Sequence, residues 1–426
     1  MGSNPNTFGG IPETWSREYQ IVHDKVPVYP AISNYRLAAG LQVGDTVHRS
    51  YPTSLVAKVM GADGSYSTQA ITDTDETLLI DKNYETSFYV KELDELQNSL
   101  PVRTQYAKRS MVAIFNQIDG DILGLYDQFT QTVDDGDLGG TAGNGITVTS
   151  ANAKKLFFTA RRLLQRQNIL LDNAAAFTGF KSEDDQNAMG VAVITPDVYQ
   201  ALLEAVDGKD TVFGDAVAKS GHSGMFANFN IFVSNAVGWS ATLGMATNPS
   251  DADTITINGV VITFKTTVDA GTTAGQTKVA STVDLTRANL VAFLNAPTTT
   301  VADATNAGYN ALSAANALLL GNMTFTNSNS ADTMTVKATG RGYVTVAEGL
   351  TPAADGWTAA LQVQHCLFGV ANAIDVVIQK DPSLKIKDAP SAKVGSDFIT
   401  WTACGYKVFN EAKLKMLDAW IRTDAY

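Results

Sequence analysis

The sequence contains few of the residues that build metal and redox sites. Its 426 residues include 2 cysteines and 4 histidines. Cys366 and Cys404 alone cannot form a disulfide framework or a cysteine-rich metal centre. So few histidines in so long a chain also argue against a histidine-based metal enzyme. We therefore expect neither a bound metal nor any other cofactor.

Basic residues are scarce as well. The chain has 31 Lys and Arg against 43 Asp and Glu, which gives a formal net charge of −12. A protein this acidic is not expected to bind nucleic acid over its whole surface. Hydrophobic residues make up 45% of the chain, which is enough for a sizeable core and excludes wholesale disorder.

Signals for secretion and membrane insertion are missing. Residues Met1 to Thr14 are rich in Gly, Asn and Pro and contain no apolar signal-peptide core. The long uncharged stretches 220–250 and 356–374 carry polar residues that a lipid-spanning helix would not place so densely. We expect a soluble protein, made in the cytoplasm, without a membrane partner.

The first 97 residues are extended in character. Residues 1–44 predict an N-terminal arm, because Pro27 and Pro30 break any helix there. Residues 45–97 predict a β-hairpin whose polar tip contains the turn Gly61–Gly64. The strands of this hairpin are expected at about 47–59, 77–80 and 84–90. Such a hairpin is marginal in water, so it needs a partner surface.

Residues 98–170 predict two amphipathic helices. Apolar residues recur with helical spacing over about 104–130, and Ser150 is the predicted N-cap of the second helix. The apolar face of the second helix comprises Ala153, Leu156, Phe157, Ala160, Leu163 and Leu164. Its opposite face carries Lys154, Lys155, Arg161 and Arg166. We interpret that basic face as solvated or paired with carboxylates rather than as a phosphate site.

The remainder divides into three segments. Residues 171–239 have an α/β pattern, with a buried strand at 191–195 and a helix that starts at Pro196. Residues 240–357 are rich in Thr and predict a self-contained inserted α+β domain. Within it, Asn258-Gly259 predicts a type I′ turn, and a helix follows Thr282. The further strands of this domain are expected at 323–326, 334–338 and 343–347.

Residues 358–426 return to the earlier pattern. The spacing of Leu361, Leu367, Val370 and Ile374 predicts a helix. The β-branched and aromatic run 398–409 predicts a central strand.

No motif with catalytic stringency is present. The loop 139–145 is Gly-rich but lacks the pattern of a phosphate-binding loop. Asp134, Asp135 and Asp137 resemble the start of a calcium loop, but the closing Glu is missing. His365 and Cys366 are adjacent, and no third group that would orient them is visible. We expect no enzymatic activity and no catalytic, cofactor-binding or metal-binding residues.

The order of these segments resembles the major capsid protein fold of tailed double-stranded DNA bacteriophages, which encapsulins share. Residues 51–97 resemble its E-loop, 101–130 the spine helix of its P-domain, and 190–203 its A-domain strand and helix. The run 229–237, with a strand that ends in Ser-Asn, and the run 405–409 also resemble parts of this family. The expected fold is α+β, with an N-arm, an E-loop, a P-domain, an A-domain and an inserted small domain at 240–357.

The resemblance implies a shell protein that self-assembles into hexameric and pentameric capsomers in a virion. It further implies a separate scaffolding protein, a portal, and in some relatives a decoration protein, with double-stranded DNA enclosed without sequence-specific contacts. Contacts between subunits are expected from the arm and the E-loop at Tyr19, Val26, Tyr29, Lys58, Asp63, Tyr66 and Lys82. Some relatives crosslink a lysine of this loop to an asparagine. Asn410 is a nominal partner here, but no catalytic Glu can be assigned.

Two other interpretations stay open at this point. An encapsulin-type cellular compartment has the same fold, although the insert and the long arm favour the virus. A hydrolase with an appended β-domain is disfavoured because no nucleophile or metal constellation is visible.

Overall fold

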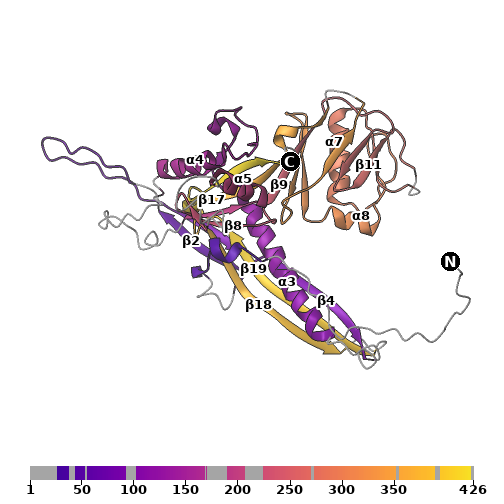
Figure 1. Ribbon diagram of the computed structural model, residues 1–426, viewed down its shortest axis with the longest axis horizontal. Helices are drawn as coiled ribbons and strands as arrows, with labels where there is room; N and C mark the ends of the chain where they lie inside the picture. Colours follow the sequence, from indigo (N-terminus) through magenta and orange to yellow (C-terminus); the bar gives the residue numbers. More distant parts are fainter. Residues whose placement is uncertain are drawn as a thin grey trace, which may run out of the picture. The chain divides into compact units, whose positions relative to one another are not determined.

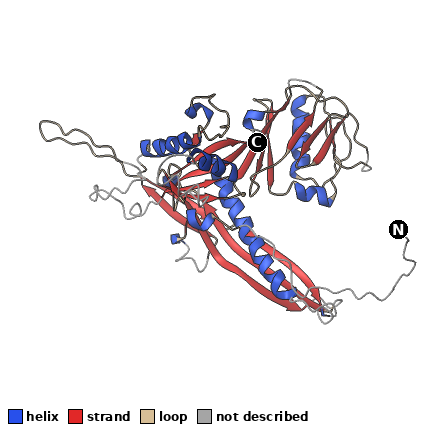
Figure 2. Cartoon of the chain, in the orientation of Figure 1, coloured by secondary structure: helices blue, strands red, loops and turns tan. Residues whose placement is uncertain are grey.

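The computed structural model describes residues 26–37, 44–52, 55–92, 102–167, 169, 190–206, 224–269, 273–351, 355–388 and 394–423. The chain divides into two compact units. Unit 1 comprises Met1–Val26, Lys82–Asn116 and Lys380–Ala403, and unit 2 comprises Pro27–Asp81, Gln117–Gln379 and Cys404–Tyr426. Both units mix helices and strands (Figure 2), so the α+β prediction is confirmed. No helix among the described residues is long and apolar enough to cross a membrane.

Unit 1 combines one helix with long strands. It contains β4 (Lys82–Lys91), the first part of α3 (Val102–Leu123), the second part of β18 (Ile374–Asp388) and the first part of β19 (Gly395–Lys407). The strands run in the order β18-β19-β4. Phe88 stacks on Phe398 with ring centroids 4.9 Å apart and lies 5.8 Å from Tyr106 of the helix. These aromatic contacts hold the helix against the strands.

Unit 2 is built on a ten-stranded sheet with the order β13-β14-β9-β17-β6-β8-β7, to which β16, β20 and β5 are attached. Its strands are β5 (Gln131–Val133), β6 (Gly190–Ile194), β7 (Met225–Phe226), β8 (Phe229–Val233), β9 (Gly238–Gly244), β13 (Met323–Ser328), β14 (Thr333–Ala338), β16 (Gly356–Trp357), β17 (Val363–Val370) and β20 (Met416–Arg422). Every residue of β17 is buried, because the sheet is covered on both faces around it.

The predicted helix over 361–374 is therefore wrong, since β17 occupies most of it. A strand that is buried on both faces loses its alternating pattern and becomes a continuous apolar run. Periodicity alone cannot distinguish such a run from a buried helix.

Two helices lie over one face of the sheet, α4 (Ala153–Arg166) and α5 (Pro196–Val206) (Figure 1). The six apolar residues predicted for the inner face of α4 are all buried, and they join Ile194, Phe229 and Phe368 in one core cluster. The helix begins after Asn152 rather than Ser150, so the predicted cap is wrong. Asn152 accepts a hydrogen bond from the Thr149 N–H at 2.7 Å, which closes the turn before the helix.

The inserted segment forms a second core in unit 2. Its elements are β10 (Thr254–Ile257), β11 (Val260–Lys265), β12 (Gln276–Lys278), α7 (Val283–Asn295), α8 (Ala314–Leu319) and β15 (Val346–Gly349). Asn258 and Gly259 have φ of 51° and 79°, which confirms the type I′ turn. Thr282 caps α7 by accepting a hydrogen bond from the Leu285 N–H at 3.4 Å.

The inserted segment is not independent of the main sheet. Strand β14 pairs with β9 along its whole length, and β9 pairs with β17 at residues 238–240. Trp239 and Leu243 of β9 belong to the same core cluster as Phe293 of α7. The boundaries 240–357 stay a prediction, but the expectation of a self-contained unit must be corrected, because β9 serves both the segment and the sheet.

The hairpin near the start of the chain consists of β2 (Thr46–Pro52) and β3 (Asp73–Leu79), paired from Thr46 opposite Leu79 to Pro52 opposite Asp73. The sequence placed a third hairpin strand at 84–90, but β4 lies in unit 1. Shorter elements of unit 2 are α1 (Tyr29–Ile32), β1 (Ser33–Asn34), η2 (Gly124–Gln128), η3 (Asp135–Leu138), η6 (Ala359–Leu361) and η7 (Asn410–Ala412).

Candidate functional site

A buried chain of polar side chains links three strands of unit 2. The Nε2 atom of His365 lies 2.8 Å from Ser240 Oγ, and its Nδ1 atom lies 2.7 Å from Asp418 Oδ2. Ser240 belongs to β9, His365 to β17 and Asp418 to β20. This connectivity is that of a serine-histidine-aspartate triad. No pattern in the sequence indicated the orienting carboxylate, because Asp418 is far from His365 along the chain.

The surroundings of this chain make it a structural network rather than a catalytic one. The His365 ring stacks on Tyr126, with centroids 3.6 Å apart and planes at 6°. The Trp420 indole N–H donates to Asp418 Oδ2 at 2.8 Å. The side chains of His365 and Asp418 are each 4% exposed. The imidazole is buried and Tyr126 covers one face of its ring, so a substrate has no approach to it.

Burial also shifts the pKa values of titratable groups near this network. It raises the pKa of the Tyr126 phenol well above its usual range, and the charge of Asp418 acts in the same direction. Burial likewise raises the pKa of the Cys366 thiol to about 12, which leaves no thiolate for nucleophilic chemistry at neutral pH. Cys366 is therefore a core residue, as its place in the main core cluster indicates.

The other residues that the sequence offered as candidate metal ligands do not form a metal site among the described residues. Among the described residues no group of three His, Cys, Asp or Glu side chains could hold a metal ion. In the loop 134–145, Asp134 and Asp137 form a reciprocal capping box, and Asp135 accepts a hydrogen bond from the Thr141 N–H at 2.9 Å. His48 contacts Asp75 at 2.6 Å on an exposed surface. His23 and His222 lie outside the described residues.

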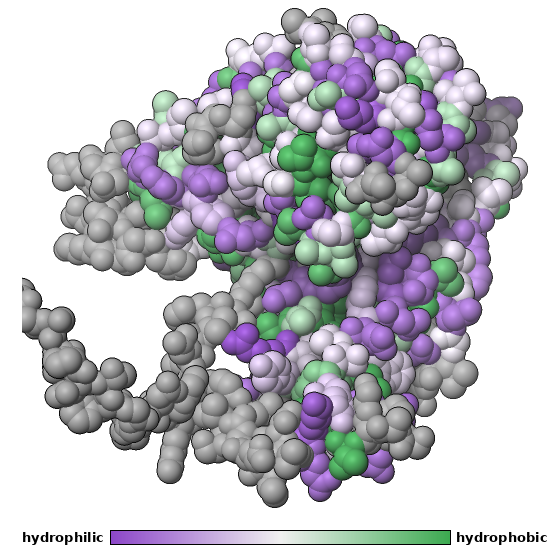
Figure 3. Space-filling model, turned by 90° about the vertical axis from the view of Figure 1, so that its right-hand side faces the viewer, coloured by the Kyte–Doolittle hydropathy of each residue, from purple (hydrophilic) through white to green (hydrophobic). Residues whose placement is uncertain are grey.

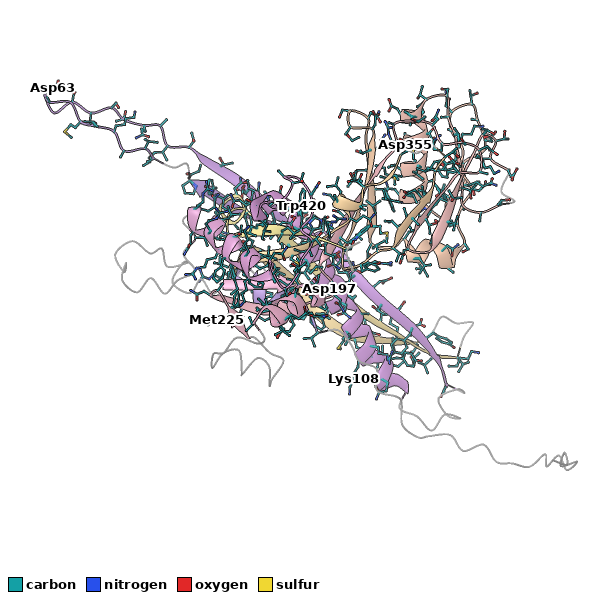
Figure 4. The ribbon with its side chains drawn as sticks, turned by 45° about the horizontal axis from the view of Figure 1, so that its top comes forward. Asp63, Lys108, Asp197, Met225, Asp355 and Trp420 are labelled. Atoms are coloured by element: carbon teal, nitrogen blue, oxygen red, sulfur yellow. The ribbon has the colours of Figure 1, made fainter. Side chains whose placement is uncertain are left out.

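The tip of the β2–β3 hairpin gathers several exposed apolar side chains among the described residues of unit 2. It projects away from the sheets of this unit, with Asp63 at its end (Figure 4). No strand is assigned to residues 55–72. The exposed apolar side chains of the tip are Leu55, Val56, Val59, Met60, Tyr66 and Ile71. Val59 is 100% exposed and Tyr66 79% exposed, so these residues gain nothing from the core of their own chain.

The tip is shaped by short polar contacts. Lys58 Nζ donates to Ser67 Oγ at 3.1 Å. Asp63 Oδ1 accepts from the Ser65 hydroxyl at 2.7 Å and from the Ser65 N–H at 3.1 Å. These hydrogen bonds hold the pKa of Asp63 below its ordinary value. Three of the predicted contact residues, Lys58, Asp63 and Tyr66, thus lie together on one protruding loop.

The other predicted contact residues are dispersed. Tyr19 lies outside the described residues. Val26 is 79% exposed, but it belongs to unit 1, as does Lys82 at the start of β4. Lys82 is therefore not part of the hairpin, contrary to the prediction. The side chain of Tyr29 is buried within its own chain, and its contact with a neighbouring subunit stays a prediction.

Burial of the segment around Tyr29 has a clear cause. The backbone N–H groups of Val28 and Tyr29 both donate to Asp119 Oδ1 at 2.8 Å. Asp119 is itself buried. A carboxylate that accepts two backbone N–H groups anchors the chain firmly at this point.

The root of the hairpin is fixed by charged groups. Arg49 of β2 contacts Asp375 at 3.4 Å and also pairs with Glu411 of η7. Asn34 donates to the other Asp375 oxygen at 2.7 Å. Burial raises the pKa of Asp375 to about 6, although the charge of Arg49 lowers it. The hairpin thus has an anchored root and a free tip.

The face drawn in Figure 3 shows hydrophilic and hydrophobic residues interspersed. Scattered exposed apolar residues are normal for soluble proteins. A gathered set such as the hairpin tip needs a separate explanation.

Comparisons with known proteins give a consistent result. No family model matches the chain, and no curated protein matches its sequence. Among solved structures, it is similar to a chain from Mycobacterium phage Che8, with 14% identity, a TM-score of 0.56 and coverage of 97% of this chain and 98% of that chain. It is also similar to the capsid structure of the cyanophage P-SCSP1u, with 12% identity, a TM-score of 0.52 and coverage of 96% and 93%. These likenesses confirm the predicted fold over nearly the whole chain.

Proposed function

We propose that this chain is the major capsid protein of a tailed double-stranded DNA bacteriophage and that copies of it form the icosahedral head shell. The observation that carries the proposal is the likeness to a phage capsid structure over 96% of the chain. A likeness of this length includes the arm, the hairpin, the long helix and the inserted segment together, rather than one common motif.

The hairpin supports a role in assembly. Exposed apolar side chains at Leu55, Val59 and Tyr66 cost free energy in water when they have no partner. A second copy can cover them, and an extended loop can also pair its backbone with a neighbour. A ring of identical copies repeats each such contact, so many weak contacts give a stable closed assembly.

The interior of unit 2 supports the same role. Its one triad-like arrangement among the described residues is buried beneath Tyr126. These buried polar side chains therefore hold strands together, which suits a shell subunit better than a hydrolase.

The proposed partners follow from the proposed role. Copies of the chain are the main partner, in hexameric and pentameric capsomers. A separate scaffolding protein, a portal and a decoration protein are further proposed partners, and double-stranded DNA would be enclosed without sequence-specific contacts. The proposed place of assembly is the cytoplasm of the bacterial host, and the final location is the virion.

Size-exclusion chromatography and negative-stain microscopy test this proposal. The purified chain should be examined at increasing concentration and with a crowding agent, alone and with a co-expressed scaffolding protein. We expect capsomer-sized rings or closed shells of uniform diameter. A chain that stays monomeric under all of these conditions would contradict the proposal.

A further inference from the structure

The outer face of α4 is cationic although the chain is acidic. Lys154, Phe158, Arg162 and Arg166 follow one another at every fourth position of the helix, so they line one ridge of its surface. We call these four residues the α4 ridge. Phe158 is 53% exposed, and Arg162 and Arg166 are exposed as well.

Asp137 lines the same hollow as three residues of the ridge, and its carboxylate already accepts a hydrogen bond from the Asp134 N–H. Asp134 accepts a hydrogen bond from the Gly143 N–H at 2.6 Å, and it shares a capping box with Asp137. Among the described residues, Lys154, Arg162 and Arg166 form no ion pair and no side-chain hydrogen bond. In a chain with a net charge of −12, three cations that form no ion pair among the described residues leave the ridge available to an external partner.

The ridge borders a hollow of about 490 Å³. Its lining combines basic, aromatic and small residues: Asp137, Ala151, Lys154, Lys155, Phe158, Thr159 and Arg162. Lys155 donates to the Leu138 carbonyl at 2.6 Å, which fixes one wall of the hollow. The surface therefore offers a concave site with positive charges at its rim and an apolar ring beside them.

We propose that the α4 ridge binds a carboxylate-bearing surface of a second copy of this chain. The proposal rests on the proposed function, because it names a contact through which copies join. Copies in a ring meet through two different surfaces, each facing the other type on the next copy. A basic ridge on one edge then meets the acidic surface that the rest of the chain supplies.

A protein partner fits the ridge better than nucleic acid. The bases of duplex DNA are stacked inside the helix, so an exposed phenyl ring between two cations has nothing to contact there. Arg and aromatic residues are the types enriched at protein interfaces.

Variants in which Gln replaces Arg or Lys, and which therefore lose positive charge, test this proposal. The double variant R162Q/R166Q changes the net charge by two and leaves the buried face of α4 intact. The matched control is K385Q/K387Q, which removes two exposed charges from β18 in unit 1. Circular dichroism and the thermal midpoint should show both variants folded. We expect the concentration needed for assembly to rise by about tenfold in R162Q/R166Q and to stay unchanged in the control.

A third variant addresses the ring. Phe158→Ser should weaken assembly without unfolding the chain, since Phe158 is exposed. A short labelled DNA duplex at low salt should bind neither the wild type nor R162Q/R166Q.

Three outcomes of these experiments would count against the proposal. Equal assembly of the wild type and R162Q/R166Q would overturn it while leaving the proposed function intact. DNA binding by the wild type that is lost in R162Q/R166Q would identify nucleic acid as the occupant instead. If neither the wild type nor the control assembles, the proposed function fails and this proposal fails with it.

Discussion

The imidazole of His365 stacks face to face on the phenol ring of Tyr126, with centroids 3.6 Å apart. Tyr126 lies in η2, directly after α3, and His365 lies in the central strand β17. The stacking therefore fixes the end of the long helix segment against the middle of the main sheet. Three strands contribute to the polar network behind it, so this junction couples helix and sheet in unit 2.

Gly238 makes the junction sensitive to a single methyl group. A Cβ atom at Gly238 would lie 2.3 Å from Tyr126 Cε1, whereas the only neighbour within 4 Å of a Cβ atom at Gly244, on the same strand, would be the Gly356 carbonyl oxygen at 3.7 Å. We expect Gly238→Ala to lower the free energy of unfolding by about 1–3 kcal/mol. Gly244→Ala is the matched control, because both changes reduce unfolded-state entropy alike. Urea denaturation measures both, and equal stabilities would contradict the close packing.

The buried network predicts that Ser240 is chemically inert. Its hydroxyl contacts His365, whose ring is buried and covered on one face by Tyr126. We expect no labelling of the folded chain by a fluorophosphonate probe, followed by intact-mass spectrometry. A known serine hydrolase treated in parallel confirms that the probe is active. Stoichiometric labelling at Ser240 would show that the site is accessible and would revive the hydrolase interpretation.

Asp375 predicts a pH dependence of stability. Burial raises its pKa from an ordinary 3.8 to about 6. Between these values the folded state holds a proton that the unfolded state has lost, so this group makes stability fall as pH rises towards 6. Above pH 6 the loss is complete and constant.

Asp375→Asn should remove that decline, because asparagine stays neutral and can still contact Asn34. The stability of the variant relative to the wild type should rise between about pH 4 and 6 and then level off. Thermal midpoints across this pH range measure it. Asp381→Asn, an exposed position on the same strand, is the control and should show no such step. A flat difference for Asp375→Asn would mean that the carboxyl titrates normally.

The hairpin tip should be needed for assembly and not for folding. Replacing residues 58–67 by Asn-Gly keeps a tight turn and removes Val59, Met60 and Tyr66. Because these side chains make no core contact, the free energy of unfolding should change by less than about 0.5 kcal/mol. Particle formation should be abolished, as sedimentation velocity would show. Ser67→Ala, which removes only the partner of Lys58, should assemble normally. Particles from the shortened chain would exclude the proposed role of the tip.

Local signals in the sequence predicted several elements accurately. Asn258-Gly259, the Thr282 cap and the apolar face of α4 each depend on neighbouring residues, so a short window is enough to recognise them. The fold itself was predicted from the order of such elements. The helix predicted over 361–374 was wrong for the opposite reason. Burial of β17 on both faces comes from tertiary packing, and it hides the alternating pattern of a strand.

The residues of the polar network and of the arm were harder to predict for a similar reason. Ser240, His365 and Asp418 meet only when β9, β17 and β20 pair, and no spacing rule connects them. Tyr29 was predicted to lie in an extended arm, but its backbone N–H donates to the buried Asp119 carboxylate, which holds it in the core. The tip residues Lys58, Asp63 and Tyr66 could be predicted, because a polar turn between two strands marks a protruding loop without tertiary information.

Cryo-electron microscopy of particles formed by the full chain would show whether copies of the chain cover one another's hairpin tips. We expect a closed shell in which the hairpin tip of one copy, including Val59 and Tyr66, is covered by the adjacent copy. Particles whose tips point freely into solvent, or a preparation that contains single chains only, would contradict it.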